Sequence, residues 1–213
     1  MSNKKLSKEP ENKKEFTRIL DEAYSKYAHL YDIAVKAFPL WKQWIKKVIP
    51  YIQGPRILEL SFGTGYLLTK YADQFETYGI DYNKKMVEIA RKNLEKNNIS
   101  AKLRRADVES LPYPDNYFDS IVNTMAFTGY PRAYKAMSEI RRVLKSDGRL
   151  IMVDVNYPKN QNWLGTLMAK FWESEGDIIR NMDKMFKNSG FLHIDKEVGG
   201  FGSVHLYYAK IKN

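Results

Sequence analysis

The sequence predicts an α/β fold in which helices cover both faces of a mostly parallel sheet, and two observations carry this prediction. Short apolar runs alternate with amphipathic segments through most of the 213 residues, which is typical of strand–helix–strand units. The last two apolar runs, 191–198 and 203–211, are separated by only four residues, whereas a parallel crossover needs about a dozen. We therefore expect a sheet of seven strands whose last strand is antiparallel.

The expected elements follow from apolar periodicity and from glycine and proline punctuation. Strands are predicted at 56–60, 77–81, 101–107, 118–125, 149–155, 191–198 and 203–211. Helices are predicted at 15–34, 39–50, 67–72, 86–97, 130–145, 160–175 and 177–189. No repeat or linker divides the chain. We expect a disordered tail over 1–14, an N-terminal helical cap over 15–53 and one ligand-binding domain over 54–213.

Composition excludes several classes of protein. The chain has no cysteine, which excludes disulfide scaffolds, zinc sites built on cysteine and thiol catalysis. Its three histidines, at 29, 193 and 205, lie in no tight cluster, so we expect no metal site. The apolar runs are far shorter than the ~20 residues of a membrane-spanning helix, and the first 15 residues hold no signal sequence. A cytoplasmic enzyme or binding protein is expected.

The formal net charge is +10, and residues 1–50 supply half of it, with 11 basic and 6 acidic side chains. Such an excess suits nucleic acid, an anionic membrane or an anionic substrate. It is equally typical of charge that only keeps a protein soluble.

A loop of small residues, Ser61–Gly65, joins the first buried strand to a helix. Ligands of open α/β sheets bind at the carboxyl ends of strands, where such loops let the backbone approach closely. The N–H groups of the following helix would favour a negatively charged ligand group. The alternative is an ordinary strand–helix turn.

Three acidic residues stand at or near the ends of successive predicted strands: Glu59, Asp81 and Asp107. Asp81 follows Gly63 by 18 residues, where a carboxylate accepts from a ribose diol. The third glycine of a dinucleotide fingerprint is replaced by Leu68, which disfavours a dehydrogenase. Converging carboxylates favour a cationic ligand with hydrogen-bond donors, unless they are unrelated strand-end caps.

The successive motifs ILELSFGTGYL, YGIDYNKKMVEIA, RRADVESLPYPDNYFDSIV and MSEIRRVLKSDGRLIMVDV resemble those of class I S-adenosylmethionine-dependent methyltransferases of the type 11 group. The resemblance covers 54–156 and implies a Rossmann-like fold with an antiparallel last strand. Tyr31-Asp32, Leu40-Trp41-Lys42 and Gly199-Gly200 followed by His205 resemble the ubiquinone/menaquinone-biosynthesis C-methyltransferase branch. Phospholipid N-methyltransferases share much of this pattern.

The resemblance implies that S-adenosylmethionine is the cofactor and implies a role for each matching residue. Glu59 would face the methionine amine through water, and Gly63, Thr64 and Gly65 would wrap the methionyl part. Asp81 would hold the ribose, with Tyr82 and Met86 against the adenine. Asp107 would accept from the adenine amine, the Val108 N–H would donate to a ring nitrogen, and Asn123 would lie beneath the sulfonium.

Ser61 departs from the family, which usually has glycine at that position. A serine is tolerated there without strain if its φ is negative, and it narrows the methionyl pocket. A binding protein that does not turn over is the alternative that this departure leaves open.

Four further residues are weaker candidates. His205 is either a general base for a phenolic substrate or a structural histidine. Tyr130 would face the substrate side. Tyr27 and Tyr31, one helical turn apart, would form a lid or pack in the core.

The expected function is methyl transfer to a small-molecule acceptor, quinone-like or lipid. RNA methylation is the alternative that the charge invites, although residues 123–131 lack the Asp/Asn-Pro-Pro-aromatic run of enzymes that methylate amino groups of nucleic acids. The aromatic face of residues 16–44 either caps the cofactor pocket or contacts anionic lipid. The sequence leaves the oligomeric state open.

Overall fold

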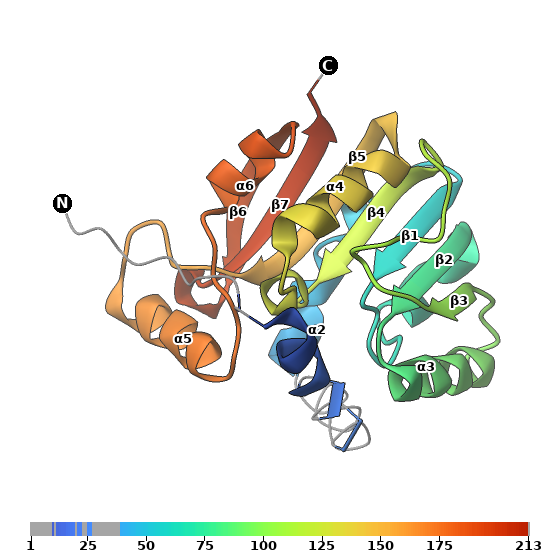
Figure 1. Cartoon of the computed structure of the whole chain (residues 1–213), viewed down its shortest axis with the longest axis horizontal. Helices are drawn as coiled ribbons and strands as arrows, with labels where there is room; N and C mark the ends of the chain where they lie inside the picture. Colours follow the sequence, from blue (N-terminus) through green and yellow to red (C-terminus); the bar gives the residue numbers. More distant parts are fainter. Residues whose placement is uncertain (1–9, 11, 20, 23–24, 27–38, 213) are drawn as a thin grey trace.

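The computed structural model describes residues 10, 12–19, 21–22, 25–26 and 39–212. Its centre is a sheet of seven strands in the order β3-β2-β1-β4-β5-β7-β6 (Figure 1). The strands are β1 (Arg56–Leu60), β2 (Glu76–Asp81), β3 (Lys102–Arg105), β4 (Phe118–Thr124), β5 (Leu144–Val155), β6 (Phe191–Gly199) and β7 (Val204–Ile211). The first five are parallel, and β7 runs antiparallel to both β5 and β6. The predicted sheet is confirmed.

Helices cover both faces of this sheet. They are α2 (Pro39–Lys46), α3 (Lys84–Lys96), α4 (Ala133–Val143), α5 (Trp163–Ser174) and α6 (Met182–Asn188). Buried side chains of α4 and α6 pack with strand residues such as Leu58 and Leu60 into one core. Those of α2 and α3 pack with Ile57 into a second core on the opposite face. The alternation of side chains along β1 therefore separates the two cores.

Four elements differ from the sequence prediction. Residues 67–74 form two short 3₁₀ turns, Leu68–Lys70 and Ala72–Gln74, where a helix was expected. Helix α4 begins at Ala133, after Pro131, and α6 begins at Met182. Strand β5 starts at Leu144, directly after α4, because Leu144 pairs with Phe118 before the main register begins. Residues 146–148, which the prediction left between a helix and a strand, therefore lie within the strand.

The N-terminal region is described only in part. Residues 13–19, 21–22 and 25–26 are helical, so residues 13 and 14 of the expected disordered tail belong to a helix. Tyr27 and Tyr31 lie outside the described residues. The domain boundary at residue 54 stays a prediction. Within the part of the chain that the structure describes, no helix is long and apolar enough to span a bilayer.

The parallel strands place four loops at one edge of the sheet. Residues 61–66 follow β1, residues 82–83 follow β2, residues 106–109 follow β3 and residues 125–131 follow β4. The carboxyl ends of these strands meet at this edge, which is where ligands of open α/β sheets bind.

Candidate functional site

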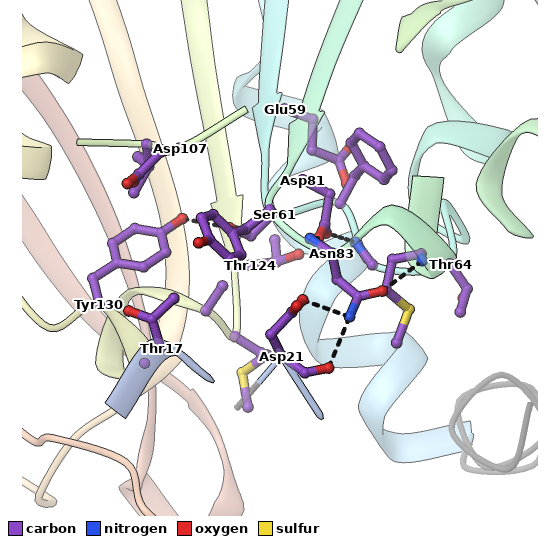
Figure 2. Close-up of a pocket in the computed structure, with 18 of the residues that line it drawn as sticks. Thr17, Asp21, Glu59, Ser61, Thr64, Asp81, Asn83, Asp107, Thr124 and Tyr130 are labelled. Carbon is purple, nitrogen blue, oxygen red and sulfur yellow. Dashed lines mark hydrogen bonds between the residues drawn. The ribbon is translucent and has the colours of Figure 1, made fainter. Parts of the chain in front are cut away.

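A cavity of about 230 Å³ opens at this edge (Figure 2). Its wall combines the loops after β1 to β4 with residues of the N-terminal segment, by which we mean the described residues 12–19, 21–22 and 25–26. The wall is rich in carboxyl groups, which come from Asp21, Glu59, Asp81, Asp107, Glu109, Glu175 and Asp177. This composition favours a ligand that carries positive charge and hydrogen-bond donors.

The loop after β1 takes a shape that requires glycine. Gly63 and Gly65 have φ values of +55° and +76°, in the left-handed region. A Cβ on Gly65 would lie 3.0 Å from that of Ala90 in α3, so Gly65 lets the loop pack on the helix and does not itself line the cavity. The Gly63 N–H points to Asp81 and donates to its Oδ2 at 2.9 Å.

Ser61 also lies in the left-handed region, with a φ of +52°. The condition for an unstrained serine, a negative φ, is therefore not met, and the backbone at Ser61 is strained because a residue with a Cβ occupies a left-handed position. Its Oγ lies 2.8 Å from the hydroxyl of Tyr130, which ties the loop to the opposite wall of the cavity. The Tyr130 hydroxyl also accepts from Asn123 Nδ2 at 2.8 Å.

Two carboxyl groups, Glu59 and Asp81, lie close enough to influence each other. Burial raises the pKa of Glu59 to about 8. The Tyr71 hydroxyl, which donates to Glu59 at 2.7 Å, lowers this pKa, and the nearby Asp81 carboxylate raises it further. Burial likewise raises the pKa of Asp81 to about 6, against the N–H groups of Asn83 and Gly63. A bound cation would favour the ionised form of both.

Asp107 belongs to a different part of the wall, apart from this pair in Figure 2. Strand β3 ends at Arg105, so Asp107 lies in the following loop. Lys13 of the N-terminal segment donates to its Oδ2 at 3.3 Å and also to Glu109. Of the three acids expected to converge, Glu59 and Asp81 therefore lie close together, whereas Asp107 pairs with Lys13.

The N-terminal segment is attached to the cavity a second time through Asn83. The Asn83 side-chain amide donates to Asp21 Oδ1 at 2.8 Å and to Ser25 Oγ at 2.8 Å. The Asn83 Oδ1 accepts the Met86 N–H at 3.0 Å and so caps helix α3. One side chain therefore begins a helix and holds the segment whose Thr17 and Asp21 line the cavity.

Most of the residues predicted to bind the cofactor line this one cavity. Those that do are Glu59, Ser61, Gly63, Thr64, Asp81, Tyr82, Met86, Asp107 and Val108, and Tyr130 joins them. Gly65 and Asn123 do not line it. Asn123 is fully buried behind Tyr130, and its Oδ1 has no hydrogen-bond partner in the described part of the chain.

His205 lies outside the cavity wall. It is buried on β7, and its Nδ1 is 2.8 Å from Asp195 Oδ1 on the neighbouring strand β6. Its ring stacks against Tyr207 at a centroid distance of 5.8 Å. These contacts agree with the second of the two alternatives that the sequence left open, a structural histidine, and that role stays a prediction.

Sequence reasoning missed several residues of the site. Asn83 carried a signal, since an asparagine directly before an amphipathic helix predicts an N-cap. Glu109 and Thr124 lie beside predicted residues at the ends of β3 and β4, so strand-end reasoning could have found them. Lys13, Thr17, Asp21 and Asp177 gave no signal, because they reach the cavity from segments far from these strand ends. Tyr71 contacts Glu59 without lining the cavity.

The strand order and the cavity at the carboxyl ends of β1 to β4 define a class I methyltransferase fold. Comparison with solved structures agrees. The methyltransferase in complex with the Trm112 activator of Haloferax volcanii is 15% identical, with a TM-score of 0.75 over 91% of this chain and 97% of that one. An S-adenosylmethionine-dependent methyltransferase of Thermotoga maritima is 17% identical, with a TM-score of 0.71 over 89% and 98%. These two likenesses concern the fold alone.

Sequence comparison defines the family. A family model described as a methyltransferase domain matches residues 58–152. The demethylmenaquinone methyltransferase of Thermotoga maritima is 31% identical over 163 residues, which are 74% of this chain and 69% of that protein. The ubiquinone/menaquinone biosynthesis C-methyltransferase UbiE of Yersinia pestis is 32% identical over 125 residues, 56% of this chain and half of that one. The chain belongs to the S-adenosylmethionine-dependent methyltransferases.

Proposed function

We propose that the cavity binds S-adenosylmethionine and that the protein transfers its methyl group to a small, quinone-like or lipid acceptor. The observation that carries the proposal is the pair of buried carboxyl groups, Glu59 and Asp81, beside the glycine loop. S-adenosylmethionine fits this wall because it brings a sulfonium, an ammonium and a ribose diol to side chains that accept hydrogen bonds and favour positive charge.

Each carboxyl group suits a different part of this cofactor. The two oxygens of Asp81 accept one backbone N–H each, which leaves each with acceptor capacity for a ribose hydroxyl. Glu59 would face the methionine amine, and Asp107 with Val108 would bind the adenine edge. The remaining contacts are proposed for Gly63 and Thr64 with the methionyl part, and for Tyr82 and Met86 with the adenine ring.

When bound, the cofactor supplies an electrophilic methyl group. The protein contributes orientation and exclusion of water, which bring the acceptor atom to within ~3–3.5 Å of that methyl group. Ser61, Tyr130 and Asn123 form a connected polar floor. Asn123 Oδ1, which has no hydrogen-bond partner among the described residues, adds negative potential there. Gly65 acts through the packing of its loop on α3.

Calorimetry tests the cofactor. We expect S-adenosylmethionine and S-adenosylhomocysteine to bind and NAD to bind far more weakly. Asp81→Ala should weaken binding roughly 10- to 1000-fold, because hydrogen bonds to a charged group are worth about 1.5–3 kcal/mol each. The matched control is Asp73→Ala, on an exposed 3₁₀ turn. Tighter binding of NAD, or an unchanged dissociation constant in Asp81→Ala, would contradict the assignment.

The acceptor class is tested by labelled methyl transfer into a cell extract. The relatives are named for demethylmenaquinone and for ubiquinone and menaquinone biosynthesis, and they support a quinone-like acceptor here. Label in the small-molecule or lipid fraction is the expected result. Label in RNA would favour the alternative enzyme class, and no label at all would favour a protein that only binds the cofactor.

An exposed apolar face on α5 supports an acceptor taken from a membrane. Trp163, Leu167 and Phe171 recur every four residues and are 72%, 60% and 54% exposed, so they share one side of the helix. Phe201, 65% exposed, lies beside them, since its carbonyl accepts from Asn162 at the start of α5. Apolar side chains on a basic protein suit an anionic lipid surface.

Helix α5 lies beside the cavity. Asp177, three residues beyond α5, lines the cavity, and Trp41 of its wall lies 6.0 Å from the ring of Trp172 in α5. Phe16, Trp41 and Trp44, which belong to the aromatic face predicted either to contact lipid or to cap the pocket, are half-buried. They fit the alternative in which this region caps the pocket. The proposal therefore keeps a cytoplasmic protein with peripheral membrane contact but moves that contact to α5.

Vesicle sedimentation tests this contact. The full-length chain should sediment with anionic vesicles, less so at high salt, and replacing Trp163, Leu167 and Phe171 with serine should weaken binding at least about tenfold. Leu192→Ser with Ile194→Ser, on an exposed part of β6, is the matched control. Absence of salt-sensitive binding by the wild type would overturn the membrane contact and favour a soluble acceptor.

A further inference from the structure

The hydroxyl of Thr128 lies between two carboxyl groups. Its Oγ1 is 3.0 Å from Asp154 Oδ1 and 2.6 Å from Asp177 Oδ1. A threonine hydroxyl has a single hydrogen and can donate it to only one of them. The other contact must therefore be donated by a protonated carboxyl group, so the two aspartates hold a proton between them.

The backbone identifies Asp154 as the ionised member. Its Oδ2 accepts the N–H groups of Phe127 at 2.6 Å and Thr128 at 3.2 Å, and its Oδ1 accepts that of Val155 at 2.7 Å. Three N–H donors stabilise a carboxylate, and the Thr128 hydroxyl completes its acceptor positions. Burial raises the pKa of Asp154 to about 6, still below neutral pH.

In this arrangement Asp177 is the member that carries the proton and donates it to Thr128, so the structure shows the acid form of Asp177. The ionised form, which exists above the pKa of Asp177, lacks this proton and can accept one. Burial raises the pKa of Asp177, the contact with Thr128 opposes this, and nearby Glu175 adds to it. Asp177 lines the cavity and is half-buried, so its carboxyl group is accessible to a ligand and to water. Asp154, by contrast, is fully buried.

The loop that carries Asp177 is fixed at both ends. The Asp177 N–H donates to the Trp172 carbonyl at 3.1 Å, at the end of α5, and the Ile178 N–H donates to the Thr128 carbonyl at 2.9 Å. Arg180, the cation of this loop, donates to the carbonyl oxygens of Phe127 and Tyr130. The groups that face Asp177 are Thr128 and Asp154 from the sheet edge and Glu175 from its own loop.

We propose that Asp177 is the general base that removes a proton from the methyl acceptor, and that Thr128 and Asp154 stabilise the proton once it has moved. This inference rests on the proposed function. The step starts from ionised Asp177: the acceptor O–H bond breaks, its electron pair stays on the acceptor oxygen, and an O–H bond forms on Asp177. The resulting acid donates to Thr128, whose own hydroxyl donates to Asp154. Release of the proton to water restores the ionised base.

The chemistry favours a phenolic or quinol-like acceptor. Removing its hydroxyl proton makes both the oxygen and the conjugated ring carbons more nucleophilic. A carboxylate base gains strength as its pKa rises towards the working pH. An acceptor that carries no proton to lose would gain nothing from Asp177.

Carboxyl carbon NMR on the ligand-free protein tests the proton assignment without any turnover. With ¹³C-labelled aspartate, and with Asp177→Asn to assign the resonance, Asp177 should titrate above its ordinary value of 3.8. Titration at or below that value would overturn the proposal. Asp154 should stay ionised at neutral pH, and a proton found on Asp154 at pH 7 would also overturn it.

Kinetics test the role as base. Asp177→Asn should lower kcat roughly 10²- to 10⁴-fold and abolish the rise of activity with pH on the acidic side, while binding of S-adenosylmethionine changes less than about threefold. Thr128→Val should lower kcat and shift that acidic limb, and Thr128→Ser should restore both. Asp147→Asn, on the exposed start of β5, is the matched control.

The outcomes separate this inference from the proposed function. If the wild type turns over and Asp177→Asn has the same kcat and pH profile, Asp177 is not the base, whereas the proposed methyl transfer still stands. A wild type that binds the cofactor but methylates no acceptor would overturn both. Loss of cofactor binding in Asp177→Asn would assign Asp177 to binding and also reject the proposed role.

Discussion

Ser61 combines a conformational cost with a compensating contact. Its left-handed φ of +52° disfavours any side chain with a Cβ, yet its hydroxyl reaches Tyr130 at 2.8 Å. Tyr130 is buried, which raises the pKa of its phenol, and the hydroxyls and amides around it hold the phenol in place. Compared with glycine, serine at position 61 is therefore more strained but gains a hydrogen bond across the cavity floor.

Replacing Ser61 separates these two effects. Ser61→Ala keeps the strained Cβ and loses the hydrogen bond, so the free energy of unfolding should fall by about 1–2 kcal/mol. Ser61→Gly loses the same bond but relieves roughly 1–2 kcal/mol of strain, partly offset by the larger entropy of glycine in the unfolded chain. Its stability should stay within about 1 kcal/mol of the wild type in urea unfolding. A glycine variant less stable than the alanine variant would disprove the strain.

Among the secondary-structure elements, helix α3 and the N-terminal segment are connected by one residue, Asn83. Asn83 caps α3 through its Oδ1 and holds Asp21 and Ser25 through its amide. Lys13 adds a second attachment, on Asp107 and Glu109. The N-terminal segment, which forms part of the cavity wall, is therefore connected to the loops that follow β2 and β3.

Two substitutions of Asn83 should have different consequences. Asn83→Ala removes the cap and should cost about 1 kcal/mol of stability, whereas Asn83→Ser keeps a capping oxygen and should cost only a few tenths. Both lose the amide donor, so both should speed tryptic cleavage at Arg18, an exposed residue of the segment. Urea unfolding and limited proteolysis measure the two effects. Equal protection of Arg18 in wild type and Asn83→Ser would show that the amide does not hold the segment.

At the scale of the whole molecule, the buried Glu59 links stability to pH. Burial raises its folded pKa from 4.5 to about 8. Between these values the folded chain keeps a proton that the unfolded chain has released, so the stabilisation is complete below pH 4.5 and is lost as pH rises towards 8. The loss is on the order of 3–5 kcal/mol, and a cation in the cavity would offset it.

The ligand-free protein should therefore melt at a lower temperature at pH 8.5 than at pH 5, and Glu59→Gln should flatten this slope. The increase in Tm caused by S-adenosylmethionine should be larger at pH 8.5. Glu76→Gln is the control, because hydrogen bonds from Lys102, Tyr78 and Arg56 lower the pKa of Glu76 to about 2, below this range. A Glu59→Gln variant with the wild-type slope would contradict the assignment.

Features of the fold that depend on neighbours along the chain could be predicted from the sequence. The alternation of strands and helices, the glycine loop after β1, the acid at the end of β2 and the antiparallel β7 all follow from spacing within a short stretch. The site residues that these patterns marked, such as Asp81 and Gly63, come together because parallel strands end at the same edge of a sheet. Their mutual contact at 2.9 Å follows from that rule.

Contacts between distant segments could not be predicted from the sequence and became visible in the folded chain. Lys13 meets Asp107 across 94 positions, and Thr128 meets Asp177 across 49. Local periodicity carries no information about such pairs, because they depend on how loops close over the finished sheet. The positive φ of Ser61 also depends on tertiary contacts, because its loop meets both Tyr130 and α3.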